Sequence, residues 1–148
     1  MKVVLQRVLE SEVRIENESS EKIDRGILVL VGIHENDIED ESKIEKMVDK
    51  IINLRIYEDE KDKMNLSLKD IDGEVLIISN FTLYGDARKG TRPSYSQAAR
   101  PELAEKYYDK FVECFKQKDV KKVATGKFGA DMKVSLVNDG PVTIVYEL

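Results

Sequence analysis

The chain has 148 residues, of which 41% are hydrophobic and 36% charged, which predicts a single folded domain over residues 1–148 and excludes a disordered chain. No apolar run approaches the roughly 20 residues that cross a bilayer, and Arg7 and Glu10 interrupt the stretch where a signal peptide would be apolar. Cys114 is the only cysteine, so no internal disulfide is possible, and we expect a soluble, cytoplasmic protein.

The charges are unevenly distributed along the chain. The formal net charge is −5, which argues mildly against a nucleic-acid partner. From Lys116 to Lys133, however, six lysines stand against two aspartates. This run is either a solvated charged face or a basic strip that contacts phosphates.

The first half of the chain predicts two long strands and a helix. Apolar residues alternate between Lys2 and Glu16, as in a half-buried strand, whereas residues 26–33 are almost all apolar, as in a strand covered on both faces. Between Glu39 and Leu54 the apolar residues recur at intervals of three and four, which indicates one face of an amphipathic helix.

The second half predicts a strand, a long loop, a second helix and two closing strands. The strand covers residues 74–78, and the loop extends from Tyr84 to Arg100. Pro101 suits the first turn of a helix. Its apolar stripe consists of Leu103, Tyr107, Tyr108, Phe111, Val112 and Phe115. The closing strands are Met132–Val137 and Val142–Tyr146, separated by Asn138-Asp139-Gly140-Pro141. The order βββ-α-β-β-α-β-β implies an α+β domain in which two main helices pack on a mixed or antiparallel, barrel-like sheet.

Conventional catalytic machinery is not evident in the sequence. His34 is the only histidine, and a triad would also need a well-placed serine and carboxylate. No Cys/His/Asp cluster has metal-ligand spacing, and no Gly-rich phosphate-binding motif is present. Nucleotide hydrolysis and hydride transfer therefore lose support as functions.

Two polar interruptions next to apolar strands are the candidate functional segments. Ser79-Asn80-Phe81-Thr82-Leu83 ends one strand, and it is either such a segment or a plain strand end. Asn138-Asp139-Gly140-Pro141-Val142-Thr143 has the composition of a hairpin turn. A proline just before a strand is unusual there, because it offers no N–H to the ladder, and its peptide bond can adopt the cis form.

Several segments spread over nearly the whole chain resemble one known family. They are Leu5-Gln6-Arg7-Val8, Asn53-Leu54-Arg55, Lys63-Met64-Asn65-Leu66-Ser67, Lys89-Gly90-Thr91-Arg92-Pro93-Ser94, Thr125-Gly126-Lys127-Phe128-Gly129-Ala130-Asp131-Met132 and Asn138-Asp139-Gly140-Pro141-Val142-Thr143. With these segments the sequence resembles the D-aminoacyl-tRNA deacylase family. One departure is visible: the family's usual Ser-Gln-Phe-Thr-Leu is Ser-Asn-Phe-Thr-Leu here, so Asn80 keeps the amide but is one methylene shorter.

The resemblance implies a homodimer with no metal and no soluble cofactor. It would hydrolyse D-aminoacyl-tRNA, and glycine mischarged on tRNA(Ala), while refusing L-aminoacyl esters. Each of two sites at the interface would be completed by Gly140 and Pro141 of the partner chain, which act as a chiral filter. We place Ser79, Asn80, Met132 and Arg7 in the same substrate-binding region. A related fold edits mischarged tRNA in archaeal threonyl-tRNA synthetases, so another mischarged substrate, a tRNA 3′-end binding module without turnover and a purely structural dimer remain alternatives.

The absence of a histidine base is consistent with assistance from the free 2′-hydroxyl of the tRNA. The protein would then supply main-chain donors for the developing oxyanion, and our candidates are the N–H groups of Phe81 and Thr82. The Thr82 hydroxyl is the alternative, as a nucleophile, but no activating group is evident for it. Phe81 and Met132 either flank the substrate or belong to the core. Lys121, Lys122 and Lys127 are the candidate contacts to tRNA phosphates.

Overall fold

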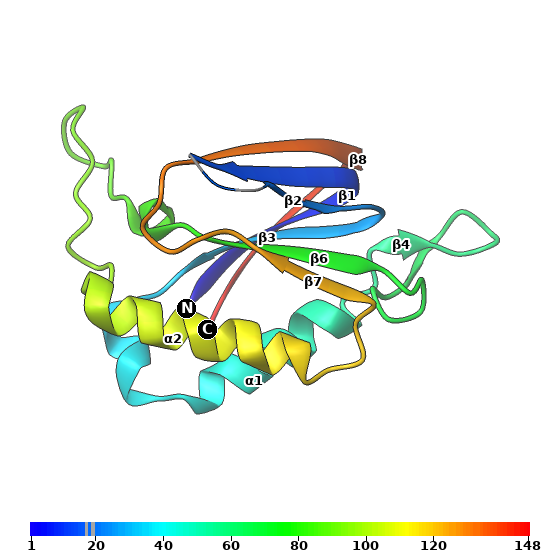
Figure 1. The fold of residues 1–148 in the computed structure, drawn as a ribbon, viewed down its shortest axis with the longest axis horizontal. Coiled ribbons are helices and arrows are strands. Elements are labelled where there is room, and N and C mark those ends of the chain that lie inside the picture. Colours follow the sequence, from blue (N-terminus) through cyan, green and yellow to red (C-terminus); the bar gives the residue numbers. More distant parts are fainter. Residues whose placement is uncertain (17, 19) are drawn as a thin grey trace.

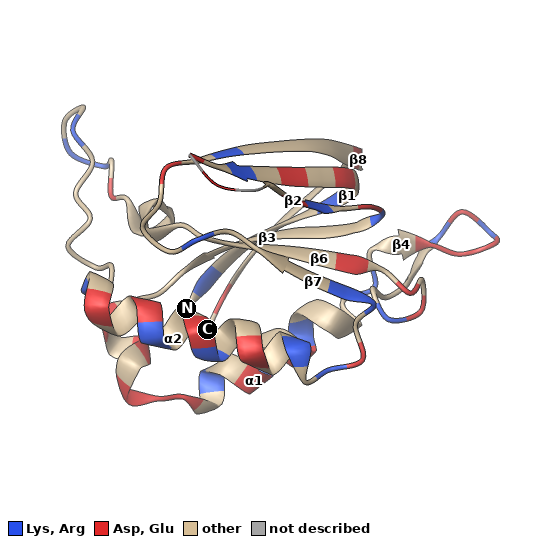
Figure 2. Ribbon diagram, in the orientation of Figure 1, with Lys and Arg blue, Asp and Glu red and all other residues tan. Residues whose placement is uncertain are grey.

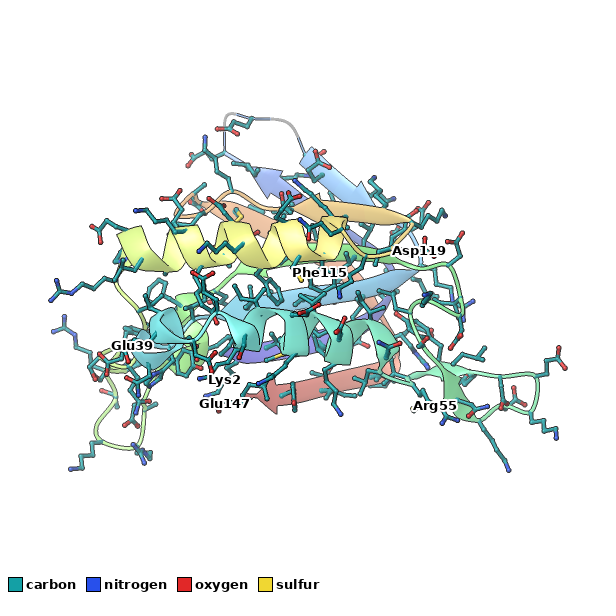
Figure 3. The ribbon with its side chains drawn as sticks, turned by 90° about the horizontal axis from the view of Figure 1, so that it is seen from below. Lys2, Glu39, Arg55, Phe115, Asp119 and Glu147 are labelled. Carbon is teal, nitrogen blue, oxygen red and sulfur yellow. The ribbon has the colours of Figure 1, made fainter. Side chains whose placement is uncertain are left out.

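The computed structural model describes residues 1–148 except 17 and 19 (Figure 1). Two helices lie side by side on one face of a curled mixed sheet, which confirms the expected α+β class (Figures 1 and 3). The strands are β1 (Lys2–Ile15), β2 (Ser20–Ile23), β3 (Gly26–Gly32), β4 (Tyr57–Glu58), β5 (Met64–Leu66), β6 (Glu74–Ser79), β7 (Lys122–Thr125) and β8 (Met132–Glu147). The α-helices are α1 (Ser42–Asn53) and α2 (Pro101–Lys116), and two 3-10 helices are η1 (Glu35–Glu39) and η2 (Phe81–Tyr84). In the described part of the chain, no helix has the length and apolarity needed to cross a membrane.

The sheet combines antiparallel and parallel pairing. Its order is β2-β1-β3-β6-β7, and β8 also pairs with β1. Strand β1 is antiparallel to β2, β3 and β8, whereas β3–β6 and β6–β7 are parallel. Strands β4 and β5 form a separate ribbon. Because the central strands are parallel, their carboxyl ends lie at the same edge of the sheet.

The central strands are apolar on both faces because each face covers a different core. The core consists of two apolar clusters, a larger one that includes the helices and a smaller one on the other face of the sheet. On β3, Val29 belongs to the larger cluster and its neighbour Leu28 to the smaller one. Strand β6 repeats the pattern with Ile77 in the larger and Leu76 in the smaller cluster. Since successive side chains of a strand point to opposite faces, burial on both sides explains the unbroken apolar runs seen in the sequence.

The last strand differs from the prediction. Both predicted closing segments pair with β1 in the same antiparallel direction, so β8 is one continuous strand, and residues 138–141 do not reverse the chain. The register pairs Gln6 with Thr143 but Val8 with Asn138, so four residues of β8 lie opposite the single residue Arg7. Extra residues on one strand form a bulge, which bends the strand without ending it.

Three smaller differences concern a strand that was not predicted, one residue of α2 and the start of α1. Strand β7 was not predicted, because four residues with two apolar side chains carry little periodic signal and the strand forms by pairing with β6. Leu103 was assigned to the buried stripe of α2 but is 45% exposed, because it lies one residue off the stripe that starts at Ala104. Helix α1 begins at Ser42, later than expected, because His34 caps the short helix η1 before it.

A buried carboxylate anchors the segment between the sheet and α1. Asp37 is 1% exposed, and it accepts hydrogen bonds from the backbone N–H of His34 (2.8 Å) and from Lys43 Nζ (2.8 Å). The α-ammonium of Met1 lies 2.6 Å from Asp37 Oδ2, the same oxygen that accepts from His34. Burial alone raises the pKa of Asp37, but the Lys43 and Met1 ammonium groups and the His34 N–H outweigh it, so the pKa lies below its usual value.

We therefore expect Asp37→Asn to lower the free energy of unfolding by about 3 kcal/mol at pH 7, since it leaves the buried Met1 ammonium and the partly buried Lys43 without their counter-charge. Because the folded-state pKa is lowered, the contribution of Asp37 is complete above the unfolded pKa and is lost as the pH falls through the folded value. Urea unfolding of both proteins between pH 7 and pH 3 measures this. Glu41→Gln, which removes an exposed partner of Lys110, is the control and should leave the unfolding midpoint unchanged. A midpoint for Asp37→Asn equal to that of the control would contradict the assignment.

Candidate functional site

A cavity of about 590 Å³ opens at the edge of the sheet where the parallel strands β3 and β6 end. Val31 and Ile33 reach it from the end of β3, and Ser79 and Asn80 reach it from the end of β6. The remaining walls come from the loop before α2, from the first turns of α2 and from the connection between β7 and β8. The residues that complete its lining are Phe81, Tyr95, Ala98, Ala99, Arg100, Pro101, Ala104, Phe128, Gly129, Ala130 and Met132.

The turn after β6 is closed by the side chain of Asn80. Its Oδ1 accepts a hydrogen bond from the Thr82 N–H (3.2 Å) and another from the Thr82 hydroxyl, which makes it the N-cap of η2. The Thr82 N–H is thus committed within the chain, whereas the Phe81 N–H meets no acceptor among the described residues. Of the two donors expected from the sequence, only that of Phe81 is therefore free.

Aromatic rings flank this turn and the facing wall. The Phe81 ring is 59% exposed and meets the edge of the Tyr95 ring at a centroid distance of 5.2 Å. Phe128, also part of the lining, packs beside Tyr108, whose hydroxyl donates to the Ile77 carbonyl (2.9 Å) in the core strand β6. The walls are thus anchored to the rigid part of the sheet, while the Phe81 ring remains open to solvent.

Met132 is held beside the cavity by a glycine. It is half-buried at the start of β8 and packs against the smaller core cluster. A Cβ on Gly126 would lie 2.5 Å from Met132 Sδ and 2.9 Å from Ile78 Cδ1, so the thioether occupies the space that the missing side chain leaves. The position of Met132 therefore serves both the core and the cavity, and the two roles proposed for it from the sequence are compatible.

The lining that the structure describes offers hydrogen bonds rather than acid–base groups. Its polar side chains are the hydroxyls of Ser79 and Tyr95, the amide of Asn80 and the guanidinium of Arg100. None of these side chains is a carboxylate or an imidazole, the groups that most often act as a general base. The site is therefore suited to orienting a bound group and to stabilising negative charge through fixed N–H donors.

Gly140 and Pro141 do not line the cavity of their own chain. They are exposed in the β8 bulge, and the peptide bond between them is cis. Gly140 has a φ of +126°, and a Cβ there would lie 2.9 Å from Val142 Cγ2 and 3.0 Å from Arg7 Nη2. Only glycine fits this position without strain.

Arg7 holds the bulge from beneath. It is 3% exposed, donates from Nε to the Asp139 carbonyl (3.0 Å) and donates from Nη1 to the Ile56 carbonyl (2.7 Å). Its charge is met by the Asp139 carboxylate, 3.2 Å from Nε, and more distantly by Glu58. Arg7 therefore contacts the Gly140 segment, as grouped from the sequence, but not the cavity.

The three predicted tRNA-binding lysines fall into two places. Lys121 pairs with Glu74 (3.1 Å) and Lys122 donates to the Lys22 carbonyl (2.5 Å), both at the amino end of β6. Strand β6 runs from Glu74 to Ser79, so at about 3.3 Å per residue its amino end lies roughly 16 Å from Ser79. Lys127 lies in the connection that lines the cavity and pairs with Glu18.

Sequence reasoning missed several lining residues. Phe128 belongs to one of the motif segments, and Tyr95 follows another, but neither was singled out as part of a site. Ala98, Ala99 and Arg100 carry no signal of their own, because they line the cavity only through the path of the loop. Position within a motif segment, for Phe128, or directly after one, for Tyr95, was the only signal that pointed to these two residues.

Comparison of the sequence with known proteins gives a match over the full chain. The profile of the family described as D-Tyr-tRNA(Tyr) deacylase matches residues 4–147. A D-aminoacyl-tRNA deacylase of Thermosipho africanus is 53% identical over 147 residues, covering 99% of this chain and 97% of the relative. One from Clostridioides difficile is 54% identical with the same coverage.

Solved structures give the same picture of the fold. A structure titled c-Myc DNA Unwinding Element Binding Protein has a TM-score of 0.89 and 43% identity, covering 100% of this chain and 99% of that one. A probable eukaryotic D-amino acid tRNA deacylase has a TM-score of 0.84 at 17% identity, covering 99% and 98%. The second likeness concerns the fold alone.

Proposed function

The chain belongs to the D-Tyr-tRNA(Tyr) deacylase family, and we propose that it hydrolyses the ester between a D-amino acid and its tRNA, releasing the free amino acid and the tRNA. The observation that carries the proposal is the free Phe81 N–H at the edge of a cavity in which motif segments of this family meet. We extend the proposal to glycine mischarged on tRNA(Ala), because glycine has no side chain for a chiral filter to reject. We place the reaction in the cytosol, where charged tRNA is used.

Catalysis is proposed to rest on the substrate's own hydroxyl and on the protein backbone. The 2′-hydroxyl beside the ester positions and activates water, which adds to the carbonyl carbon. The resulting oxyanion accepts a hydrogen bond from the Phe81 N–H, and the bond to the 3′-oxygen then breaks as that oxygen takes up a proton. The cap from Asn80 supports this role, because it fixes the turn that carries the donor.

Rejection of L-amino acids is assigned to the partner's copy of Gly140 and Pro141. The pair is exposed, a glycine leaves its carbonyl groups accessible, and Arg7 fixes the bulge by holding the neighbouring Asp139 carbonyl. Carbonyl oxygens placed against the α-carbon accept hydrogen bonds from the α-ammonium and fill the space that an L side chain needs. Such a filter reads the α-carbon and tolerates many D side chains.

The surface around the bulge supports a homodimer. Leu9 is 52% and Val137 is 45% exposed, and both lie on strands beside Gly140 and Pro141. Exposed apolar side chains next to the exposed Gly140-Pro141 pair suit a two-fold interface, in which each copy gives its bulge to the cavity of the other.

The proposed activity predicts rapid hydrolysis of D-tyrosyl-tRNA and at least about a hundredfold slower hydrolysis of L-tyrosyl-tRNA, a difference of at least about 2.7 kcal/mol. Single-turnover release of radiolabelled amino acid from the two esters measures the ratio, with Gly-tRNA(Ala) expected to behave like the D-ester.

The mechanism also predicts that EDTA leaves both rates unchanged. Binding of D-tyrosyl-tRNA without turnover would instead favour a tRNA-end binding module, and equal rates for both esters would contradict the filter.

The backbone mechanism predicts a small effect for one variant and a large effect for its neighbour. Thr82→Ala removes a hydroxyl that donates to Asn80 and should slow hydrolysis of D-tyrosyl-tRNA by less than about tenfold. Phe81→Pro deletes the free N–H at the first position of η2, where proline is compatible with the helix, and should slow it by about 100- to 1000-fold. Thermal melting checks that both variants are folded. If Thr82→Ala costs several orders of magnitude while folded, the hydroxyl is the catalyst and the substrate-assisted mechanism is wrong.

Completion of the site by a second copy predicts complementation between inactive variants. Phe81→Pro damages the cavity and Gly140→Ala damages the bulge, so each homodimer should be nearly inactive on every substrate. After unfolding and refolding together at equal amounts, half of the dimers pair one chain of each kind and contain one intact site. Activity should then recover to about one quarter of that of the unmodified protein. No recovery, with mixed dimers verified by mass spectrometry, would show that bulge and cavity act within one chain.

A further inference from the structure

We infer that the loop between η2 and α2, residues 85–100, is the surface that holds the phosphates leading to the 3′ end of the tRNA. The inference rests on the proposed function, since it assumes that the terminal adenosine enters the cavity described above. Four cations and one acid occupy this loop, in a chain whose formal charge is −5. Figure 2 shows Lys and Arg at its outer tip, at the upper left of the molecule.

The tip is exposed, yet its base is ordered by hydrogen bonds. Asp86 and Ser94 exchange two backbone hydrogen bonds (2.8 and 2.9 Å) that close the tip into a hairpin. The Asp86 carboxylate also accepts from the Arg88 backbone N–H (3.0 Å) and its guanidinium (2.7 Å). The hairpin is therefore organised before any partner binds, which lowers the entropy lost on binding.

Two tip cations are available to a partner. Lys89 and Arg92 are exposed and form no ion pair within the described residues, unlike Arg88. Lys121 and Lys127, by contrast, pair with glutamates. A cation without a protein counter-charge contributes more to binding a polyanion, because no existing ion pair has to be broken.

The base of the same loop is a wall of the cavity. Tyr95 meets the Phe81 ring, and Ala98 and Arg100 line the cavity directly. The Ala99 N–H donates to the Ile33 carbonyl (2.9 Å), which fixes this wall to the end of β3. Arg92 is three residues from Tyr95, at most about 11 Å along the chain. The phosphates that immediately precede a terminal nucleoside bound in the cavity therefore lie within reach of the tip.

The test replaces Lys89 and Arg92 together by glutamine and measures binding of uncharged tRNA at several salt concentrations. Loss of two single-strand phosphate contacts should make the slope of log K against log salt less steep by about 1.4. Hydrolysis of D-tyrosyl-tRNA at low enzyme concentration should slow at least about tenfold. Hydrolysis of 3′-O-D-tyrosyl-adenosine, which has no phosphate, should not change, and this also shows that the variant is folded and active.

The matched control replaces Lys61 and Lys63, two exposed lysines of the β4–β5 hairpin at the opposite end of the molecule, where no slope change is expected (Figure 1). A third variant replaces Lys121 and Lys122. The inference is overturned if the loop variant keeps the original slope, if the control flattens it equally, or if only the Lys121/Lys122 variant flattens it. An unmodified protein that cleaves neither ester would refute the proposed function instead, and binding of uncharged tRNA would then still decide whether the loop is an RNA contact.

Discussion

The parallel pairing of β3 with β6 is the constraint on which the rest of the structure depends. Both strands are buried on their two faces, so neither can shift by one residue without moving apolar side chains between two different cores. The pairing also brings the carboxyl ends of the two strands to one edge of the sheet. The cavity lies at that edge, and its position therefore follows from core packing.

This origin explains why the proposed chemistry uses the backbone. A strand end held by two cores keeps its next N–H groups in place, and Asn80 adds the cap that turns the chain into η2. The same amide commits the Thr82 N–H, so shortening glutamine to asparagine is compatible with a side chain that shapes the turn. A donor held in this way needs no reorganisation when charge develops, which is the condition for strong electrostatic stabilisation.

The second half of the proposed site lies on a different part of the sheet. The β8 bulge is exposed on its outer side and is held beneath by Arg7, a buried cation whose hydrogen bonds are accepted by backbone carbonyls. Burying a guanidinium is costly unless its donors are satisfied, so the bulge and Arg7 stabilise each other. A rigid loop that its own chain leaves unused is well suited to recognition between copies, and the proposed dimer puts it to that use.

The sequence by itself determined the fold class and the main elements, and it singled out the segments for which a function is proposed. Long periodic or apolar runs predict strands β1, β3 and β6 and helices α1 and α2, because burial of a face leaves a repeat in the residues that face it. The motif segments also identified Ser79 to Thr82, Met132, Gly140 and Arg7 as a group. The tertiary structure decided how these residues divide between the cavity and the bulge. It also decided that residues 138–141 bulge rather than turn, that Thr82 donates to Asn80, and that Tyr95, Arg100 and Phe128 join the wall. These outcomes depend on strand register and on contacts between segments distant in the chain, and such contacts leave no period in the sequence.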